Sequence, residues 1–177
     1  FGFGMPSGCA LPGDGAGILR QTQEWTPSSL ETIAFGQEIA ATPLQIVGSF
    51  SVIANGGLLV EPRLYKGVVD ENGDYKEWAP SAPIRRVISP QTAAVMRTIL
   101  KTVVEDGTGK PAKVEGFKVG GKTGTAQKID PRTRQYSDTL YVASFCGFAP
   151  VDKPRLVIGV FLDEPRTNYW GSSEAAP

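Results

Sequence analysis

The sequence predicts an α+β fold in which an antiparallel sheet is flanked by helices. Three observations predict it: two helix starts marked by a capping residue followed by proline, a helical run followed directly by strand-like runs, and the lack of internal repeats. The chain has 177 residues, of which 41% are hydrophobic and 20% are charged. These proportions are ordinary for one soluble globular unit.

The first long helix is expected to begin at Thr42. Before it, the chain is irregular and rich in glycine and proline, with a short turn or helix start at 25–30. Thr42 suits an N-cap, Pro43 suits the first helical position, and Gln45 completes a capping box. The helix should stop at Gly56 and Gly57. Its expected apolar face consists of Leu44, Val47, Phe50, Ser51 and Ala54.

The middle of the chain predicts a surface hairpin and a second helix. Residues 58–69 suit a strand pair or an extended segment, and residues 70–74 suit a turn. Ser89 and Pro90 repeat the capping signal, and the 3.6-residue apolar spacing runs to about Val104. The residues expected to face the core from this helix are Val95, Met96, Ile99, Leu100 and Val103.

Three neighbouring strands are expected in the last third of the chain. They cover residues 120–127, 140–148 and 156–161, and residues 130–138 form a charged loop after the first strand. Strands that follow one another this closely suit an antiparallel sheet. The first strand carries polar side chains, so it needs an edge position or a cleft-facing side to present them.

That first strand contains Lys122, Thr123, Gly124 and Thr125, a set of groups that suits the binding of a carboxylate beside a reacting carbonyl. In an extended strand, Lys122 and Gly124 share one face and Thr123 and Thr125 share the other, unless twist or an edge position brings both sets toward a cleft. The glycine lets a substrate approach the backbone closely. Lys-Thr-Gly is also one of three motifs of serine enzymes that react with penicillins.

The same stretch has a competing interpretation, because residues 116–123 match the phosphate-loop pattern G-x-x-x-x-G-K-[ST]. A phosphate loop follows a buried strand and opens a helix whose amides point at the phosphates. The preceding residues 107–116 are polar and turn-forming, and the residues after Gly124 leave no room for a helix. A nucleotide-binding protein is therefore the weakest alternative, and it depends on whether Gly124 opens a helix or continues a strand.

Composition excludes several classes of function. The formal net charge is zero, which gives no basic footprint for nucleic acid. No apolar run approaches the length of a membrane span. The chain contains no histidine, which excludes Cys-His catalysis and the common zinc sites, and we expect neither a metal nor a cofactor. Cys9 and Cys146 are expected to be unpaired, because Cys146 falls in an apolar run typical of a small buried residue.

Four blocks of the chain, in order, resemble class B penicillin-binding proteins, and most closely the division-type (FtsI-like) peptidoglycan transpeptidases. The blocks are Phe1-Gly2-Phe3-Gly4 with residues 11–17, residues 35–45 with 54–57, residues 119–127, and Tyr169-Trp170-Gly171 through Ala175-Ala176-Pro177. The resemblance implies part of the penicillin-binding and serine β-lactamase-like transpeptidase fold. It also implies cross-linking of peptidoglycan stem peptides that end in D-Ala-D-Ala through a serine acyl-enzyme, and covalent binding of β-lactams.

The resemblance also implies roles for residues of the motif strand. Lys122 would add positive charge beside the nucleophile, and the hydroxyls of Thr123 and Thr125 would bind the substrate carboxylate. The backbone N–H of Thr125 would supply one oxyanion-hole donor. Gly124 would allow the close approach, and Gln127 would edge the substrate groove. Gln37 and Glu38 are expected to support the fold and not to touch substrate.

The chain departs from the family in one respect, because it contains neither Ser-x-x-Lys nor Ser-x-Asn. We therefore expect residues 1–177 to be the C-terminal portion of a single transpeptidase domain, truncated at both ends and inactive alone. The membrane anchor is expected in the absent N-terminal part, at the periplasmic face of the bacterial cytoplasmic membrane. Other cell-division or cell-wall synthesis proteins are the expected partners.

Two further alternatives stay open. A serine β-lactamase or a β-lactam sensor would share the fold, although residues 36–45 favour the transpeptidase. A non-catalytic interaction module would have lost the serine motifs, and it would gain weight if the gene began near Phe1.

Overall fold

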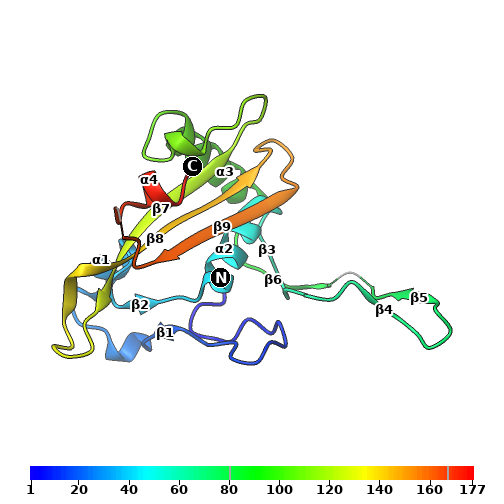
Figure 1. Cartoon of the computed structure of the whole chain (residues 1–177), viewed down its shortest axis with the longest axis horizontal. Helices are drawn as coiled ribbons and strands as arrows, with labels where there is room; N and C mark the ends of the chain where they lie inside the picture. The colour runs from blue at the N-terminus through cyan, green and yellow to red at the C-terminus, as the bar shows by residue number, and fades with distance from the viewer. Residues whose placement is uncertain (80, 167) are drawn as a thin grey trace.

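The computed structural model describes residues 1–79, 81–166 and 168–177, and it confirms the α+β class. The central sheet has three antiparallel strands in the order β7, β8, β9 (Figure 1). The bounds are Gly120–Ile129 for β7, Tyr136–Ala149 for β8 and Leu156–Asp163 for β9. Among the described residues no other strand pairs with β7, so the expected edge position of this strand is confirmed.

Both long helices begin where their capping residues predict. Helix α2 (Pro43–Ala54) has the Thr42 hydroxyl as acceptor for the backbone N–H of Gln45, and the Gln45 side chain accepts the N–H of Thr42. Helix α3 (Pro90–Glu105) has the Ser89 hydroxyl as acceptor for the N–H of Thr92 at 3.0 Å. These bonds satisfy N–H groups that have no partner within the helix.

The buried faces of these helices differ from the predicted ones. The expected apolar face of α2 is only partly buried, whereas Gln45, Val52 and Ile53 are buried. Gln45 tolerates burial because its amide nitrogen donates to the carbonyls of Met5 and Ala16, each at 2.8 Å.

On α3, the prediction that Val95 and Ile99 face the core is wrong, since they are 59% and 50% exposed. The buried residues of this helix are Ala93, Leu100 and Val104. They form one narrow stripe, and the two exposed residues lie off it.

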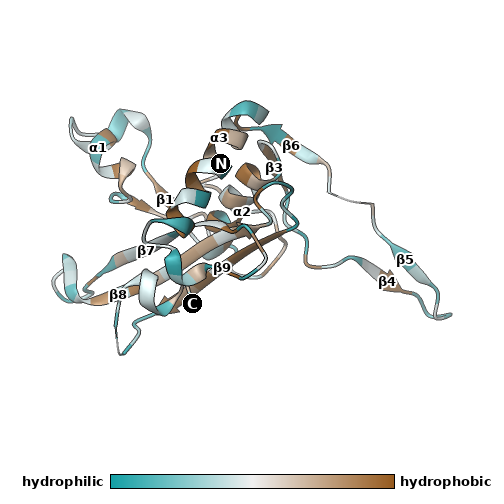
Figure 2. Ribbon diagram, turned by 90° about the horizontal axis from the view of Figure 1, so that it is seen from above, coloured by the Kyte–Doolittle hydropathy of each residue, from teal (hydrophilic) through white to brown (hydrophobic). Residues whose placement is uncertain are grey.

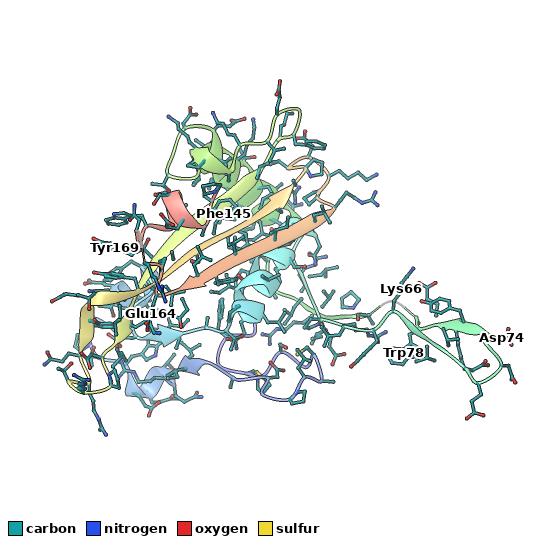
Figure 3. All side chains as sticks on the ribbon, viewed as in Figure 1. Lys66, Asp74, Trp78, Phe145, Glu164 and Tyr169 are labelled. Carbon is teal, nitrogen blue, oxygen red and sulfur yellow. The ribbon has the colours of Figure 1, made fainter. Side chains whose placement is uncertain are left out.

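Both faces of the sheet are covered, and α3 contributes a buried residue to each of the two clusters. Phe145 and Phe148 are an odd number of residues apart on β8, so their side chains point to opposite faces. Phe148 packs with Ile53 of α2 and Leu100 of α3. Phe145 packs with Val104 and with Ala175 and Ala176, which follow the short helix α4 (Gly171–Glu174). Figure 2 shows α2 and α3 on one side of the sheet and the C-terminus on the other, and Figure 3 labels Phe145.

An arm formed by residues 61–79, 81 and 82 extends away from the sheet (Figure 1). It begins where β3 (Leu58–Val60) pairs with β6 (Pro83–Arg86), and it ends in the hairpin of β4 (Gly67–Val69) and β5 (Tyr75–Glu77). The predicted hairpin around the turn at 70–74 is confirmed. The pairing of β3 with β6 was not predicted.

The connection from β7 to β8 corrects another expectation. Residues 130–138 were predicted as a charged loop, but β8 already begins at Tyr136. The Gln127 side chain donates to the backbone of Ser137, and Ile129 pairs with Tyr136, so cross-strand bonds extend the strand into the charged segment.

The N-terminal region is built from short elements. Strand β1 (Ile18–Leu19) pairs with β2 (Ile39–Ala40), and between them lie the 3-10 helix η1 (Thr22–Glu24) and helix α1 (Ser29–Ala34). The turn or helix start expected at 25–30 therefore covers the connection after η1 and the beginning of α1. A second 3-10 helix, η2 (Lys110–Ala112), follows α3.

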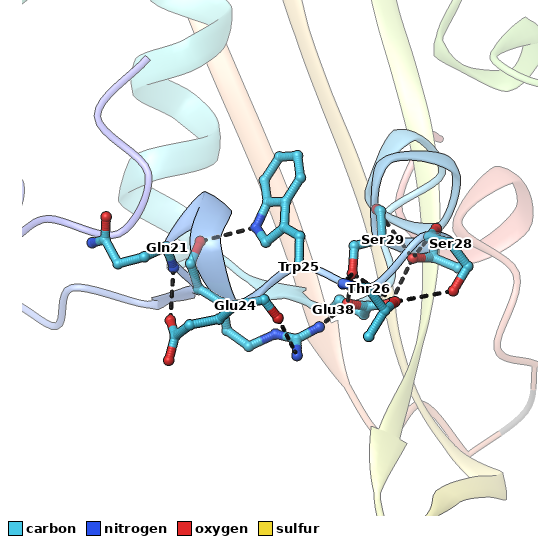
Figure 4. Close-up of polar contacts among 9 residues, drawn as sticks. Gln21, Glu24, Trp25, Thr26, Ser28, Ser29 and Glu38 are labelled. Carbon is cyan, nitrogen blue, oxygen red and sulfur yellow. Dashed lines mark hydrogen bonds and ion pairs between the residues drawn. The ribbon is translucent and has the colours of Figure 1, made fainter.

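Glu38 joins these short elements, as expected for a residue that supports the fold. Its carboxylate accepts hydrogen bonds from the hydroxyls of Thr32 at 2.7 Å and Ser29 at 2.8 Å, and it also pairs with Arg20 (Figure 4). The hydrogen bonds from Thr32 and Ser29, aided by the charge of Arg20, hold the pKa of Glu38 below its usual value. The structure therefore confirms the supporting role of Glu38.

Cys9 and Cys146 are both buried and do not form a disulfide, which confirms that prediction. Burial raises the pKa of Cys146 to about 12. Within the described ranges, no helix is long and apolar enough to cross a membrane. The same residues hold no group of three or more His, Cys, Asp or Glu side chains that could bind a metal.

Candidate functional site

The candidate site lies along the unpaired edge of β7. In the register with β8, Lys122 lies opposite Cys146 and Thr125 lies opposite Ala143, so the whole motif is held in one regular ladder. Gly124 continues the strand and does not open a helix. The phosphate-loop interpretation is therefore wrong, because its glycines and lysine lack the helix N-terminus that would bind phosphate.

Lys122 and Thr123 meet at this edge, although their positions alternate along the strand. The Lys122 ammonium donates to the carbonyl oxygen of Thr123 at 2.9 Å and to its hydroxyl oxygen at 3.3 Å. The long lysine side chain curls around the strand edge to make both bonds. The edge position thus brings the predicted cation and hydroxyl together.

Each motif threonine is also held by a residue from outside the strand. The hydroxyl oxygen of Thr123 lies 3.0 Å from that of Thr108, which follows α3. The hydroxyl oxygen of Thr125 accepts the backbone N–H of Gly171, at the start of α4, at 3.1 Å. Sequence reasoning missed Thr108, and it placed Gly171 only within a resembling block.

Gly171 has no room for a side chain. A Cβ atom at this position would lie 2.3 Å from the carbonyl oxygen of Gly124 and 2.4 Å from that of Ser144. These are backbone atoms of paired strands, which cannot move aside without breaking the ladder. Helix α4 is therefore seated directly on the sheet beside the motif.

The backbone N–H groups of Thr123 and Thr125 point toward the unpaired edge. In an antiparallel pair, residues alternate between those bonded to the partner strand and those facing away. The carbonyl of Thr123 receives the Lys122 ammonium, which indicates that it faces away from β8. Thr125 is two residues further along the strand, so its backbone N–H and C=O groups also point away from β8. The edge therefore offers an ammonium group, two hydroxyls and backbone donors.

Gln127 is placed differently from the other predicted site residues. Its side-chain amide donates to the backbone carbonyl of Ser137 on β8 at 3.1 Å. This bond directs the amide nitrogen toward the neighbouring strand. The role of Gln127 at a substrate groove stays a prediction.

Aromatic side chains lie beside the C-terminal segment that carries Gly171. The rings of Tyr141 and Tyr169 are stacked with centroids 4.2 Å apart, and the rings of Tyr169 and Trp170 are 5.0 Å apart. Tyr141 lies opposite Gln127 in the sheet. The cluster therefore ties the segment before α4 to β8, and Tyr169 is labelled in Figure 3.

Comparisons with known proteins match this architecture. A family model described as the penicillin binding protein transpeptidase domain matches residues 1–177. The chain is 39% identical to penicillin-binding protein PbpB of Mycolicibacterium smegmatis and 42% identical to stage V sporulation protein D of Bacillus subtilis. Each alignment covers 100% of this chain and 28% or 27% of the relative, so the chain spans a little over a quarter of their length.

Solved structures give the same assignment. Penicillin binding protein 3 from Mycobacterium tuberculosis superposes with a TM-score of 0.87 at 40% identity, covering 96% of this chain and 40% of that one. The transpeptidase domain of penicillin-binding protein 3 from Burkholderia pseudomallei has a TM-score of 0.84 at 34% identity, covering 99% and 50%. The chain belongs to the transpeptidase domain family of class B penicillin-binding proteins.

Proposed function

We propose that this chain is the C-terminal portion of the transpeptidase domain of a peptidoglycan D,D-transpeptidase that acts through a serine acyl-enzyme. The observation that carries the proposal is the convergence of Lys122, Thr123 and Thr125 at one unpaired strand edge. A relative that is 33% identical is named probable peptidoglycan D,D-transpeptidase PenA of Neisseria gonorrhoeae. The nucleophilic serine belongs to a part of the protein outside these residues.

In this proposal, the motif strand binds the terminal carboxylate of the donor stem peptide. The hydroxyls of Thr123 and Thr125 donate to its oxygens, and the Lys122 ammonium supplies positive charge nearby. The N–H of Thr125 donates to the carbonyl oxygen that becomes negatively charged during attack. Loss of one such donor costs about two to three orders of magnitude in rate.

The chemistry is an acyl transfer in two steps. The serine oxygen forms a bond to the carbonyl carbon of the penultimate D-alanine, its proton passes to the departing nitrogen, and the terminal D-alanine leaves. The amine of a second stem peptide then attacks the ester, and the serine oxygen regains a proton. A β-lactam enters the first step, but its leaving nitrogen stays attached in the opened ring.

β-Lactam binding by this family supports the same proposal. Crystal structures of the Mycobacterium tuberculosis protein, which is 40% identical to this chain, were determined as complexes with aztreonam and ampicillin. We extend the proposal to a division-type enzyme at the outer face of the cytoplasmic membrane, anchored by a segment outside this chain. Its partners would be stem peptides and other proteins of division or wall synthesis.

The test uses the complete protein that carries this chain and a synthetic stem peptide that ends in D-Ala-D-Ala. The proposal expects release of D-alanine and formation of a peptide in which the donor acyl group is joined to the amine of a second stem peptide. Prior treatment with benzylpenicillin should block both. A β-lactamase would instead turn over many equivalents of benzylpenicillin. A non-catalytic module would neither release D-alanine nor retain the drug, and either result would contradict the proposal. The 177-residue chain alone should form no adduct.

A further inference from the structure

Thr108 lies outside the motif strand, yet its hydroxyl oxygen is 3.0 Å from that of Thr123. Fifteen residues separate the two threonines in sequence. Thr108 belongs to the short connection between α3 and η2, which neither the motif nor any feature of the proposed chemistry includes. Its role has to follow from what this contact does to the Thr123 hydroxyl.

The connection that carries Thr108 is folded tightly onto the end of α3. The backbone N–H groups of Gly107 and Gly109 both donate to the carbonyl oxygen of Val103, at 3.1 Å and 3.0 Å. A Cβ atom at Gly107 would lie 2.9 Å from the same oxygen. Thr108 is therefore fixed between two anchored neighbours, and its hydroxyl reaches the motif strand from a defined position.

The hydrogen-bond inventory of Thr123 determines what Thr108 contributes. A hydroxyl has one hydrogen to donate and two lone pairs that accept. The Lys122 ammonium only donates, so it occupies one lone pair of Thr123. If Thr108 donates as well, both lone pairs are filled and the Thr123 hydrogen is left for a ligand. If Thr123 donated to Thr108, that hydrogen would be lost to the ligand.

A carboxylate ligand decides between these two directions. An ionised carboxylate only accepts hydrogen bonds, and bonds to it are about twice as strong as bonds between neutral groups. The Thr123 hydrogen therefore turns to the carboxylate, and Thr108 becomes the donor to Thr123. Gly171 acts in a similar way on Thr125, since its N–H fills one lone pair of that hydroxyl.

We propose that Thr108 is a positioning residue, whose O–H donates to Thr123 and so directs the Thr123 hydroxyl at the substrate carboxylate. This inference rests on the proposed function of the motif strand. In this arrangement the hydroxyls of Thr123 and Thr125 both donate toward the ligand, which suits a terminal carboxylate, a pure acceptor, better than a terminal amide. An amide would set its own N–H groups against those donors.

The test compares Thr108→Val with Thr108→Ser in the complete protein. Valine keeps the shape of threonine and removes the O–H, whereas serine keeps the O–H. The second-order rate of acylation by benzylpenicillin is measured by intact mass. We expect the valine variant to react about three to ten times more slowly, the size of effect typical of one indirect hydrogen bond, and the serine variant to react within about twofold of the parent.

Thr102→Val is the matched control, because Thr102 lies on α3 and its hydroxyl donates to the carbonyl of Thr98, away from the motif. It should leave acylation unchanged, and all three variants should unfold at the temperature of the parent. Normal acylation by Thr108→Val, or equal losses in the valine and serine variants, would overturn the inference. If the parent itself forms no adduct, the proposed function fails.

Discussion

Strand β7 and the arm that ends in β4 and β5 are both exposed antiparallel structures, but they are held in very different ways. β7 pairs with β8 from Gly120 to Ile129, and residues after α3 and at the start of α4 bond to its side chains. β4 and β5 pair over only three residues each, and every residue of β5 is exposed.

The contacts within the arm are those of a solvated surface. The rings of Tyr65 and Trp78 meet edge to face at 6.2 Å, and Lys66 pairs with Glu77 at 3.2 Å while both side chains stay largely exposed. Such ion pairs contribute little to stability. The side chains of β7 are therefore held more firmly than those of the arm, which suits β7 for the proposed binding role.

The largest expected effect tests whether the lysine at the edge of β7 contributes more to acylation than an exposed lysine on the arm. Lys122→Ala in the complete protein should slow acylation by benzylpenicillin by about two to three orders of magnitude, as expected when a preorganised charged donor is lost. Lys66→Ala, which removes an exposed lysine of the arm, should leave the rate unchanged. Equal rates in the two variants, measured by intact mass against time, would remove the distinction between the regions.

The next effect compares two glycines. Gly171→Ala forces a Cβ atom against the backbone oxygens of Gly124 and Ser144, so we expect a loss of about 1–3 kcal/mol in unfolding free energy and slower acylation. Gly73→Ala, at the tip of the arm, meets no atom within 4 Å but has a φ of 88°. Its strain should stay local to the arm.

Thermal unfolding and acylation are measured for both glycine variants. The comparison predicts that the unfolding temperature falls for Gly171→Ala and stays at the parent value for Gly73→Ala. Similar shifts in both would mean that the arm is as tightly coupled to the fold as α4 is.

A smaller effect concerns pH and the region around Glu38. Hydrogen bonds from Thr32 and Ser29 lower the pKa of Glu38 in the folded protein, so its ionised form stabilises the fold above the ordinary pKa of about 4.5. That contribution is lost as the pH falls through the lowered pKa. Glu38→Gln should therefore unfold at a lower temperature than the parent at pH 7, and the difference should shrink below pH 4.

Glu77→Gln on the arm is the control for this measurement, because its carboxylate is exposed and pairs with the exposed Lys66. It should unfold at the parent temperature across the same pH range. A pH-independent difference for Glu38→Gln would show that the carboxylate charge is not what the network stabilises.

The smallest expected effect is that of removing the hairpin of the arm. Replacing residues 66–77 by a short glycine and serine turn should leave acylation of the complete protein within about twofold of the parent, because loop changes far from a packed site are well tolerated. A tenfold fall in the acylation rate, measured by the same intact-mass assay, would mean that the arm contributes to the site.

The features that sequence predicted well are local ones. The N-caps Thr42 and Ser89 act through hydrogen bonds within three residues, so the starts of α2 and α3 were predicted correctly. The motif strand was predicted from the turn-forming residues on either side of it, and its edge position from the polar side chains that it has to present. The orientation of α3 was not predicted correctly. Val95 and Ile99 have the right spacing for a core face, but the sheet lies against another face of the helix and leaves both residues exposed.

The contacts that complete the site come from far along the chain. Thr108 reaches Thr123 across 15 residues, and Gly171 reaches Thr125 across 46. Neither has a local signal, because a threonine in a turn and a glycine before a short helix are common in many settings. The pairing of β3 with β6 was missed for the same reason. It depends on the point at which the chain comes back to β3 after forming the arm.

The most direct test of the central claim is a crystal structure of the complete protein after reaction with benzylpenicillin. The account predicts that the carboxylate of the bound drug lies within hydrogen-bond distance of the hydroxyls of Thr123 and Thr125, and that the N–H of Thr125 donates to the carbonyl oxygen of the new ester. A bound drug whose carboxylate contacts neither threonine would contradict the assignment of β7 as the carboxylate-binding strand.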